Sequence, residues 1–303
     1  MFSPEERQRY ARHLDLPGFG GRAQERLRRG RVFVAGCGGL GSPALAYLAA
    51  AGVGTIGFCD GDIVSLSNLQ RQILHATTDI GRPKVDSAVA RLRALNPHVD
   101  LAPLAEPLTE ANAAVLDPYD FVVDATDSFS SKALLAALCA RRSKPCVFAA
   151  LDAFSAQLLT VIPGSTPCLR CLFPELPADA PARVACRENT APEPPNEFRE
   201  ARRRREDAVN PASSDGNAAS RNSDKAVGMD FPDKPLGPLS PIPGVIGSLQ
   251  ALEAIKYLSG IGTLHTGALL LFDALTTAFS SIALARNPAC PLCGNPETKG
   301  TTP

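Results

Sequence analysis

Short apolar runs alternate with helix-like stretches along most of the chain. The first two runs, residues 31–36 and 55–60, flank a glycine cluster and a stretch that begins at Ser42 and Pro43 and ends near Gly52. Serine and proline favour the first turn of a helix, and glycine favours the position just past its end. The pattern therefore predicts strand, turn, helix and strand within about 30 residues, a βαβ unit whose parallel strands are buried on both faces.

The alternation continues towards the C-terminus. Apolar residues at helical spacing predict helices, and short apolar runs predict strands. We expect helices over residues 84–95, 131–141 and 245–258, and strands over residues 121–124, 146–151, 157–162 and 268–274. Strands that alternate with helices predict an α/β fold, namely a doubly wound, mostly parallel Rossmann-like sheet.

The chain divides into four segments by composition. Residues 1–30 are charged and predict an N-terminal helical segment, and residues 31–186 carry the Rossmann-like part. Residues 187–236 are rich in proline, serine, asparagine and charge without a period, so we interpret them as a disordered insertion. Four consecutive arginines within it are interpreted as a solvated part of a flexible loop. Residues 237–303 are expected to complete the same domain.

Composition excludes several classes of protein. The 303 residues include 31 basic and 31 acidic side chains, and 45 % of the residues are hydrophobic. A core can therefore form, and the zero net charge argues against a protein that coats nucleic acid. Apolar runs stay shorter than the roughly 18 residues of a membrane span, and the first residues are charged. We expect a soluble, cytoplasmic protein without a membrane or nucleic-acid partner.

A glycine motif marks the turn of the first βαβ unit. It consists of Gly36, Gly38 and Gly41, with Gly39 inside it, and Asp60 closes the following strand. Such a turn lets backbone N–H groups and a helix N-terminus approach a phosphate, and an acid at the end of the next strand accepts hydrogen bonds from a ribose. Residues 31–186 are therefore expected to bind a nucleotide, whose identity the motif does not specify.

Polar and charged residues follow Asp60 within 24 positions of the sequence. Asn68, Arg71 and Lys84 supply one amide and two cations. This set suits a triphosphate, because the departing phosphates carry negative charge that must be neutralised. The alternative is that Arg71 and Lys84 are surface charges on helices, and the residues alone leave both interpretations open. His75 lies in the same stretch, and we interpret it as an ordinary histidine on a helix surface; the alternative is that it approaches the nucleotide.

Two Cys-x-x-Cys pairs stand far apart in the chain. They are Cys168 with Cys171 and Cys290 with Cys293, among nine cysteines in all. Four thiolates in two such pairs match a closed tetrahedral zinc site. Two redox pairs are the competing interpretation, and no thioredoxin-like context supports them. We expect one structural Zn²⁺ that ties the C-terminal portion to the loop after the strand at 157–162.

The motifs together resemble those of the MoeB/ThiF/HesA family, the bacterial-type relatives of ubiquitin-activating enzymes. The matching segments, in chain order, are RYARH, GCGGLG, DGDIVSLSNLQRQ, IGRPKV, DATD, CLRC, PGVIGSLQALEAIK and NPACPLC. They cover nearly the whole chain except the insertion, which falls in the region of the family's crossover loop. Within the family, the segments are most similar to those of MoeB-type sequences.

The resemblance implies an adenylyltransferase. Such an enzyme uses ATP and Mg²⁺ to adenylate the C-terminal glycine carboxylate of a small ubiquitin-fold sulfur carrier that ends in Gly-Gly, and it releases pyrophosphate. A carboxylate is a poor electrophile, and the mixed anhydride makes it open to a sulfur nucleophile. Molybdenum-cofactor biosynthesis is the expected pathway, while thiamine biosynthesis and tRNA thiolation use the same chemistry and stay open. The sulfur would come from a separate sulfurtransferase.

The resemblance also assigns roles to residues. Asp60 would hold the ribose, Asp127 would hold Mg²⁺, and Cys186 would be the thiol that precedes the crossover loop and in some relatives is conjugated to the carrier. Arg12 would reach the γ-phosphate of the neighbouring subunit in a homodimer. The phosphates would be contacted by Asn68, Arg71 and Lys84. One departure is Ser128, where family members usually carry asparagine.

Two other classes of protein remain as alternatives. An NAD-dependent oxidoreductase is supported only by the glycine turn and Asp60. A non-catalytic subunit of a heterodimeric activator would retain the fold, but the presence of Arg12, Arg71 and Asp127 argues against it. ATP–pyrophosphate exchange separates both alternatives from an adenylyltransferase.

Overall fold

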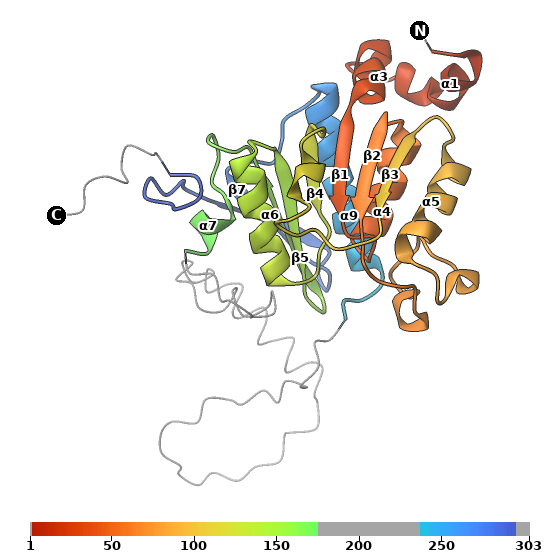
Figure 1. The fold of residues 1–303 in the computed structure, drawn as a ribbon. Helices are drawn as coiled ribbons and strands as arrows, with labels where there is room; N and C mark the ends of the chain where they lie inside the picture. Colours follow the sequence, from red (N-terminus) through yellow and green to blue (C-terminus); the bar gives the residue numbers. More distant parts are fainter. Residues whose placement is uncertain (1, 175–236, 295–303) are drawn as a thin grey trace, which may run out of the picture. The chain divides into compact units, whose positions relative to one another are not determined.

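One eight-stranded sheet organises the protein, as seen in a computed structural model that describes residues 2–174 and 237–294. The strand order across the sheet is β3-β2-β1-β4-β5-β6-β7-β8 (Figure 1). The strands are β1 (Arg31–Ala35), β2 (Thr55–Cys59), β3 (Asp100–Leu104), β4 (Phe121–Asp124), β5 (Cys146–Leu151), β6 (Ser155–Val161), β7 (Ala268–Asp273) and β8 (Ala278–Ala283).

The sheet has a parallel half and an antiparallel half. Strands β3, β2, β1, β4 and β5 pair in parallel, whereas β6, β7 and β8 extend the sheet by antiparallel pairing. The doubly wound, Rossmann-like prediction is confirmed. Two strands, β3 and β8, were not predicted from the sequence, because neither carries a strong apolar signal. β3 is a largely exposed edge strand that contains Pro103, and every residue of β8 is exposed.

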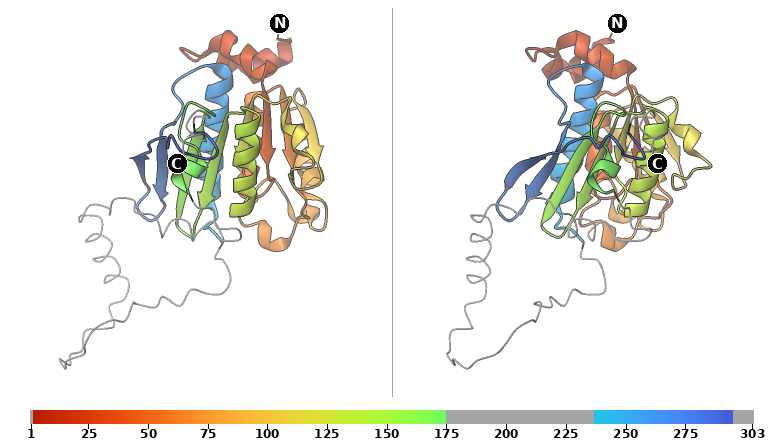
Figure 2. Two further views of the ribbon diagram at one scale, coloured as in Figure 1. Left: turned by 60° about the vertical axis from the view of Figure 1, so that its left-hand side comes forward. Right: turned by 90° about the vertical axis from the view of Figure 1, so that its left-hand side faces the viewer.

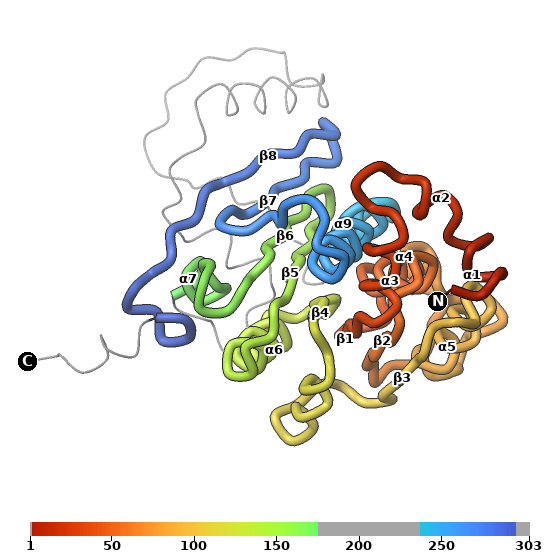
Figure 3. Tube along the Cα trace, turned by 90° about the horizontal axis from the view of Figure 1, so that it is seen from above, coloured from red at the N-terminus to blue at the C-terminus, as the bar shows by residue number. Residues whose placement is uncertain are grey.

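Helices cover both faces of the sheet. The long ones are α4 (Gly41–Ala51), α5 (Lys84–Leu95), α6 (Phe129–Arg141) and α9 (Pro241–Ser259). Seen from above, α6 lies on one side of the strands, and α4, α5 and α9 lie on the other (Figure 3). Alternate residues of β1 explain this: Val32 and Val34 pack with α4 and α9, while Phe33 and Ala35 pack with α6. Shorter helices are α7 (Leu169–Leu172), η1 (Leu66–Asn68), η2 (Thr77–Asp79) and η3 (Ala113–Leu116).

The N-terminal segment forms three helices, α1 (Pro4–Arg9), α2 (Ala11–Leu14) and α3 (Gly20–Arg29). They lie beyond the end of the sheet at which β1 begins (Figures 1 and 2). Tyr10 packs there against Gly52, which ends α4 with a positive φ of 82°, and the Asn96 amide donates to the Tyr10 hydroxyl at 2.8 Å. The N-terminal segment is therefore anchored at the C-terminal end of α4. The glycine turn lies at the other end of this helix, before Gly41.

Some expectations fall outside the described residues. These are the insertion at 187–236 and Cys186. Among residues 2–174 and 237–294, no helix combines the length and the apolar character needed to cross a membrane.

Candidate nucleotide site and metal centre

The glycine turn connects β1 to α4, and at two of its positions a side chain would collide with the backbone of the protein itself. Gly36 has a φ of +105°, and a Cβ there would lie 2.6 Å from the carbonyl oxygen of Ala125. A Cβ on Gly41 would lie 2.0 Å from the carbonyl oxygen of Gly36. Only glycine fits these two positions. The backbone of the turn therefore packs closely against the N-terminus of α4, an arrangement typical of anion-binding turns.

Asp60 lies directly at this turn, as the sequence predicts. One carboxylate oxygen accepts a hydrogen bond from the backbone N–H of Cys37 at 2.8 Å, and the other accepts one from Asp62 at 2.9 Å. The carboxylate is therefore aimed across the turn from the carboxyl end of β2.

Lys84 begins α5 and points back to the same place. Its side chain is only 7 % exposed, and its ammonium lies 2.7 Å from the Asp62 carboxylate and 3.9 Å from that of Asp60. The interpretation of Lys84 as a solvated surface charge is therefore wrong.

Arg71 approaches the turn from another side. Its side-chain stem lies 3.5 Å from where a Cβ on Gly39 would stand, and its guanidinium donates to the carbonyl of Ser67 at 3.2 Å. Pro243, near the start of α9, lies beside the same glycine. The backbone carbonyl of Asn68 accepts hydrogen bonds that hold this segment in its helical turn. The segment after η1 and the start of α9 thus border the glycine turn together.

Asp127 follows β4, the neighbour of β1. It is exposed, and the chain just before it, at Ala125 and Thr126, packs on Gly36. The adjacent Ser128 is the N-cap of α6, and its hydroxyl accepts the N–H of Ser131 at 3.1 Å. Serine and asparagine cap helices about equally well, so this departure from the family pattern leaves the local fold intact.

A buried ion pair beneath Asp127 was missed by the sequence analysis. Lys132 donates to the Asp124 carboxylate and to the carbonyl of Thr126, each at 2.7 Å. Gln250 of α9 donates to the backbone carbonyl of Asp124 at 2.6 Å. A signal existed, since Lys132 falls on the apolar face of its helix, one turn before Leu135.

The interpretation of His75 as a helix-surface residue is wrong. It is buried, 7 % exposed, and both ring nitrogens are within hydrogen-bond distance of protein atoms. The reason is that residues 69–76 form turns instead of a helix and place His75 against the backbone of Cys37 in the glycine turn.

Arg12 lies on α2 and is exposed. Because the N-terminal helices lie at the opposite end of β1, the chain does not bring Arg12 to its own glycine turn (Figure 2).

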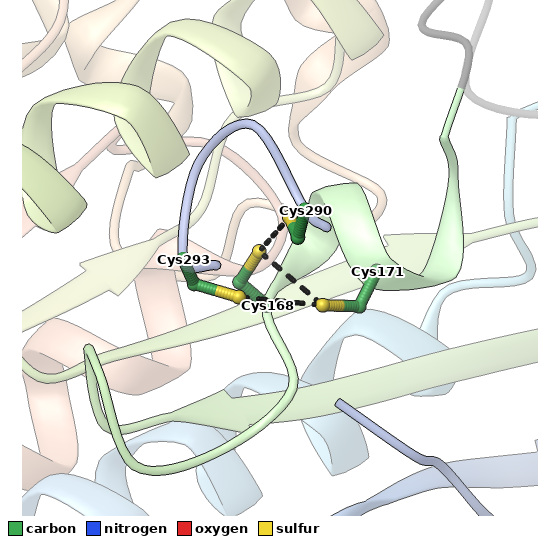
Figure 4. Close-up of side chains that lie close together, drawn as sticks. All are labelled: Cys168, Cys171, Cys290 and Cys293. Atoms are coloured by element: carbon green, nitrogen blue, oxygen red, sulfur yellow. Dashed lines mark hydrogen bonds between the residues drawn. The ribbon is translucent and has the colours of Figure 1, made fainter. Parts of the chain in front are cut away.

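The four paired cysteines converge (Figure 4). Their sulfurs all lie within 4.8 Å of one another, with 3.6 Å between Cys168 and Cys290 and 3.3 Å between Cys171 and Cys293. Four sulfurs around a tetrahedral ion with metal–sulfur bonds near 2.3 Å would stand about 3.8 Å apart. The cluster therefore fits a metal ion held by four thiolates, with Cys168 just before α7 and Cys290 in the turn after β8.

Thiol acidity differs among the cysteines. Burial alone would raise the pKa of Cys290, but hydrogen bonds from the backbone of Cys293 and Leu292 outweigh it and lower the pKa to about 7. Burial raises the pKa of Cys59 to about 12 and that of Cys37 well above its ordinary value. Cys37 and Cys59 are therefore buried thiols that behave as apolar core residues.

Comparison with known proteins assigns the family. A profile of the ThiF family matches residues 10–292. The chain is 38 % identical to a sulfur carrier protein adenylyltransferase of Thermus thermophilus, over 98 % of this chain and 94 % of that protein. It is also 38 % identical to adenylyltransferase and sulfurtransferase MOCS3 of Bos taurus, over 98 % of this chain and 55 % of that protein.

A solved structure shows the same fold. The crystal structure of E. coli MccB with MccA-N7isoASN matches with a TM-score of 0.70 and 21 % identity, over 97 % of this chain and 76 % of that one. At this identity the likeness concerns the fold. Because the family match spans most of the chain and the Thermus relative is matched nearly end to end, this chain belongs to the ThiF family and is an adenylyltransferase.

Proposed function

We propose that the protein uses ATP to adenylate the C-terminal glycine carboxylate of a small ubiquitin-fold sulfur carrier ending in Gly-Gly, with release of pyrophosphate. The observation that carries the proposal is the pair of cations at the glycine turn. Lys84 is buried beside Asp60, and Arg71 lies against Gly39. A dinucleotide held mainly by the turn needs no such pair, whereas a triphosphate does.

The acidic and basic residues of the site bind different parts of the nucleotide. Asp60, at the end of β2, accepts hydrogen bonds from the ribose, and the N–H groups of the glycine turn face the phosphates. Lys84, Arg71 and Asn68 bind the phosphates and offset the charge that develops on the departing pyrophosphate. The carrier's carboxylate and the nucleotide's α-phosphate are both anions, so these cations also lower the repulsion between them.

Two metal ions accompany this assignment. Asp127 is exposed beside the turn and holds Mg²⁺, which when bound neutralises phosphate charge. The four clustered thiolates hold a structural Zn²⁺, because they leave no open coordination position for chemistry.

The active form is a homodimer. Arg12 stands at the far end of β1 from its own turn, so it serves the γ-phosphate in the neighbouring subunit. Exposed apolar side chains on residues 61–80, next to the nucleotide site, offer a surface for that neighbour: Ile63 (59 % exposed), Leu66 (69 %), Ile73 (66 %) and Ile80 (44 %). A contiguous apolar patch marks an interaction surface, and we propose that these side chains form one in the dimer interface.

The proposed pathway is molybdenum-cofactor biosynthesis, with sulfur delivered by a sulfurtransferase and Cys186 as the candidate thiol. The similar MOCS3 is named for both an adenylyltransferase and a sulfurtransferase activity. Thiamine biosynthesis and tRNA thiolation remain the alternatives, because the nucleotide site does not distinguish carriers.

Pyrophosphate exchange tests the proposal. The protein is incubated with ATP, Mg²⁺, labelled pyrophosphate and purified carriers that end in Gly-Gly, each beside a version lacking the last glycine. Label should enter ATP only with an intact carrier, and the preferred carrier identifies the pathway. Exchange with none of the carriers, together with binding of NAD but not ATP, would overturn the proposal.

A further inference from the structure

His75 lies beneath the nucleotide site and bridges two of its elements. Nε2 lies 3.0 Å from the backbone carbonyl oxygen of Cys37 in the glycine turn, and Nδ1 lies 2.9 Å from the hydroxyl of Ser87 on α5. The ring is buried, and the proposed chemistry gives it no role. Its two contacts connect the phosphate-facing turn to the helix that begins with Lys84.

We propose that His75 is a positioning residue of the nucleotide site, which aims the glycine turn through a hydrogen bond from Nε2–H to the backbone carbonyl of Cys37. The inference rests on the proposed function for the identity of the nucleotide as ATP. It adds a residue that contacts neither phosphate nor metal and acts only through the backbone of Cys37.

The acceptor that faces Nε2 determines the tautomer of the neutral His75 ring. A carbonyl oxygen can only accept, so Nε2 must carry a hydrogen to bond Cys37. In the neutral ring, Nδ1 is then an acceptor. The Ser87 hydroxyl has one hydrogen, for which Nδ1 and the Asp79 carboxylate compete, and in the structure it is donated to Asp79 at 2.9 Å. The same carboxylate oxygen also accepts the N–H of Ala76 at 2.9 Å.

Protonation of the ring would leave the bond to Cys37 in place. An Nδ1–H would donate to the oxygen of Ser87, whose hydrogen is donated to Asp79 in the structure. The charged groups facing the ring are Asp79, Asp60 and Lys84. Burial lowers the pKa of His75 and, together with Lys84, outweighs the bond to the Cys37 carbonyl and the carboxylates of Asp79 and Asp60, which raise it; the neutral form is therefore the one present near pH 7.

The bond to Cys37 matters because of peptide geometry. Cys37 is held at both ends, since its N–H donates to Asp60 at 2.8 Å and its carbonyl accepts from His75. In a planar trans peptide the next N–H points opposite to the carbonyl. Holding the Cys37 carbonyl towards His75 therefore aims the Gly38 N–H away from the core, in the direction that an anion at the turn requires.

A nucleophilic role for the same residues does not fit. Cys37, His75 and Asp79 have the side chains of a cysteine triad, but His75 contacts the backbone carbonyl of Cys37. Burial also raises the pKa of the Cys37 thiol well above its ordinary value. The set is therefore a backbone support.

The test measures equilibrium binding of a non-hydrolysable ATP analogue with Mg²⁺ to the full chain by titration calorimetry. We expect His75→Leu to weaken binding on the order of tenfold or more, as losses of supporting hydrogen bonds do. His75→Gln keeps an N–H for the carbonyl and should bind closer to wild type. His98→Leu, which removes an exposed histidine that faces Glu5, is the matched control and should bind as wild type.

A spectroscopic readout covers the case in which His75→Leu does not fold. ¹⁵N resonances of the histidine rings should show His75 as the Nε2–H tautomer at pH 7.5, and Ser87→Ala should keep this tautomer, because the Cys37 carbonyl still accepts from Nε2–H. An Nδ1–H tautomer in the wild type, or wild-type affinity in folded His75→Leu, overturns the inference.

The outcomes separate this inference from the proposed function. Absence of pyrophosphate exchange with every carrier, with ATP binding that still depends on His75, refutes the function and supports the inference. Normal exchange together with unchanged nucleotide binding in His75→Leu refutes the inference alone.

Discussion

The ammonium of Lys132 lies 2.7 Å from the carboxylate of Asp124, and both side chains are buried. The same ammonium bonds the carbonyl of Thr126, so one lysine of α6 holds the turn that leads to Asp127. Residues Ala125 and Thr126 of this turn also pack on Gly36. The proposed metal-binding carboxylate is thus exposed, while the residues that place it are in the core.

Breaking this pair should destabilise the fold strongly. Lys132→Met leaves the Asp124 carboxylate buried without its cation, a loss of about 3–5 kcal/mol in the free energy of unfolding. Lys132→Arg should lose less, because it keeps the charge. Chemical denaturation measures both. Arg141→Met on the same helix removes an exposed pair with Glu110 and should cost less than about 1 kcal/mol. Equal losses in Lys132→Met and Arg141→Met would contradict the importance of the buried pair.

The cysteine cluster should bind about one zinc ion per chain. Cys290→Ser should release it and lower the melting temperature more than it weakens nucleotide binding, because structural zinc contributes to folding. Elemental analysis, thermal melting and calorimetry measure the three quantities. Cys139→Ala removes a buried thiol outside the cluster and should keep the metal. Native protein without any zinc would refute the assignment.

Asp127→Ala should abolish adenylation but leave the fold intact, because the residue is exposed and its loss opens no cavity. Lys84→Ala and Arg71→Ala should each lower the rate on the order of 10²-fold, the scale of one lost electrostatic contact in a transition state. Pyrophosphate exchange gives the rates, and circular dichroism reports the fold. Asp86→Ala, an exposed acid on α5, is the control. Normal exchange in the Asp127, Lys84 and Arg71 variants would remove them from the site.

Mixing two inactive variants tests the shared site. In an exchanged mixture of Arg12→Ala and Asp127→Ala chains, each heterodimer has one site with both residues intact. Random pairing should then restore about a quarter of wild-type activity. The measurement is pyrophosphate exchange after subunit mixing, with sedimentation to establish the dimer. A mixture that stays inactive, or an active monomer, would exclude a contribution of Arg12 from the partner.

Stability should depend on pH through His75. Burial lowers the folded-state pKa of His75 below its ordinary value of 6.5, so the unfolded chain takes up the proton first. The stabilisation is complete above about pH 6.5 and is lost as pH falls through the folded pKa, with a slope of at most about 1.4 kcal/mol per pH unit. Melting curves from pH 7.5 to 5.5 should show this loss in wild type and a smaller one in His75→Gln. Identical pH slopes would contradict it.

Local patterns in the sequence were sufficient for much of the fold. The strand at 146–151 and the helix at 84–95 were predicted at the bounds that the structure has, because a buried parallel strand and an amphipathic helix carry their periodicity in the chain itself. Strand β8 carries no such signal, since its place depends on pairing with β7. Edge strands of this kind are decided by their neighbours.

For the site, the sequence by itself determined the residue types whose chemistry depends on short spacing. The glycine turn with Asp60, and the two Cys-x-x-Cys pairs, are of this kind. Only the tertiary structure decided that Lys84 is buried beside Asp60, that His75 contacts the glycine turn, and that the helices carrying Arg12 lie at the other end of β1. The physical reason is that burial and pairing of a charged or polar side chain depend on which distant segments pack around it, and that arrangement exists only after the chain has folded.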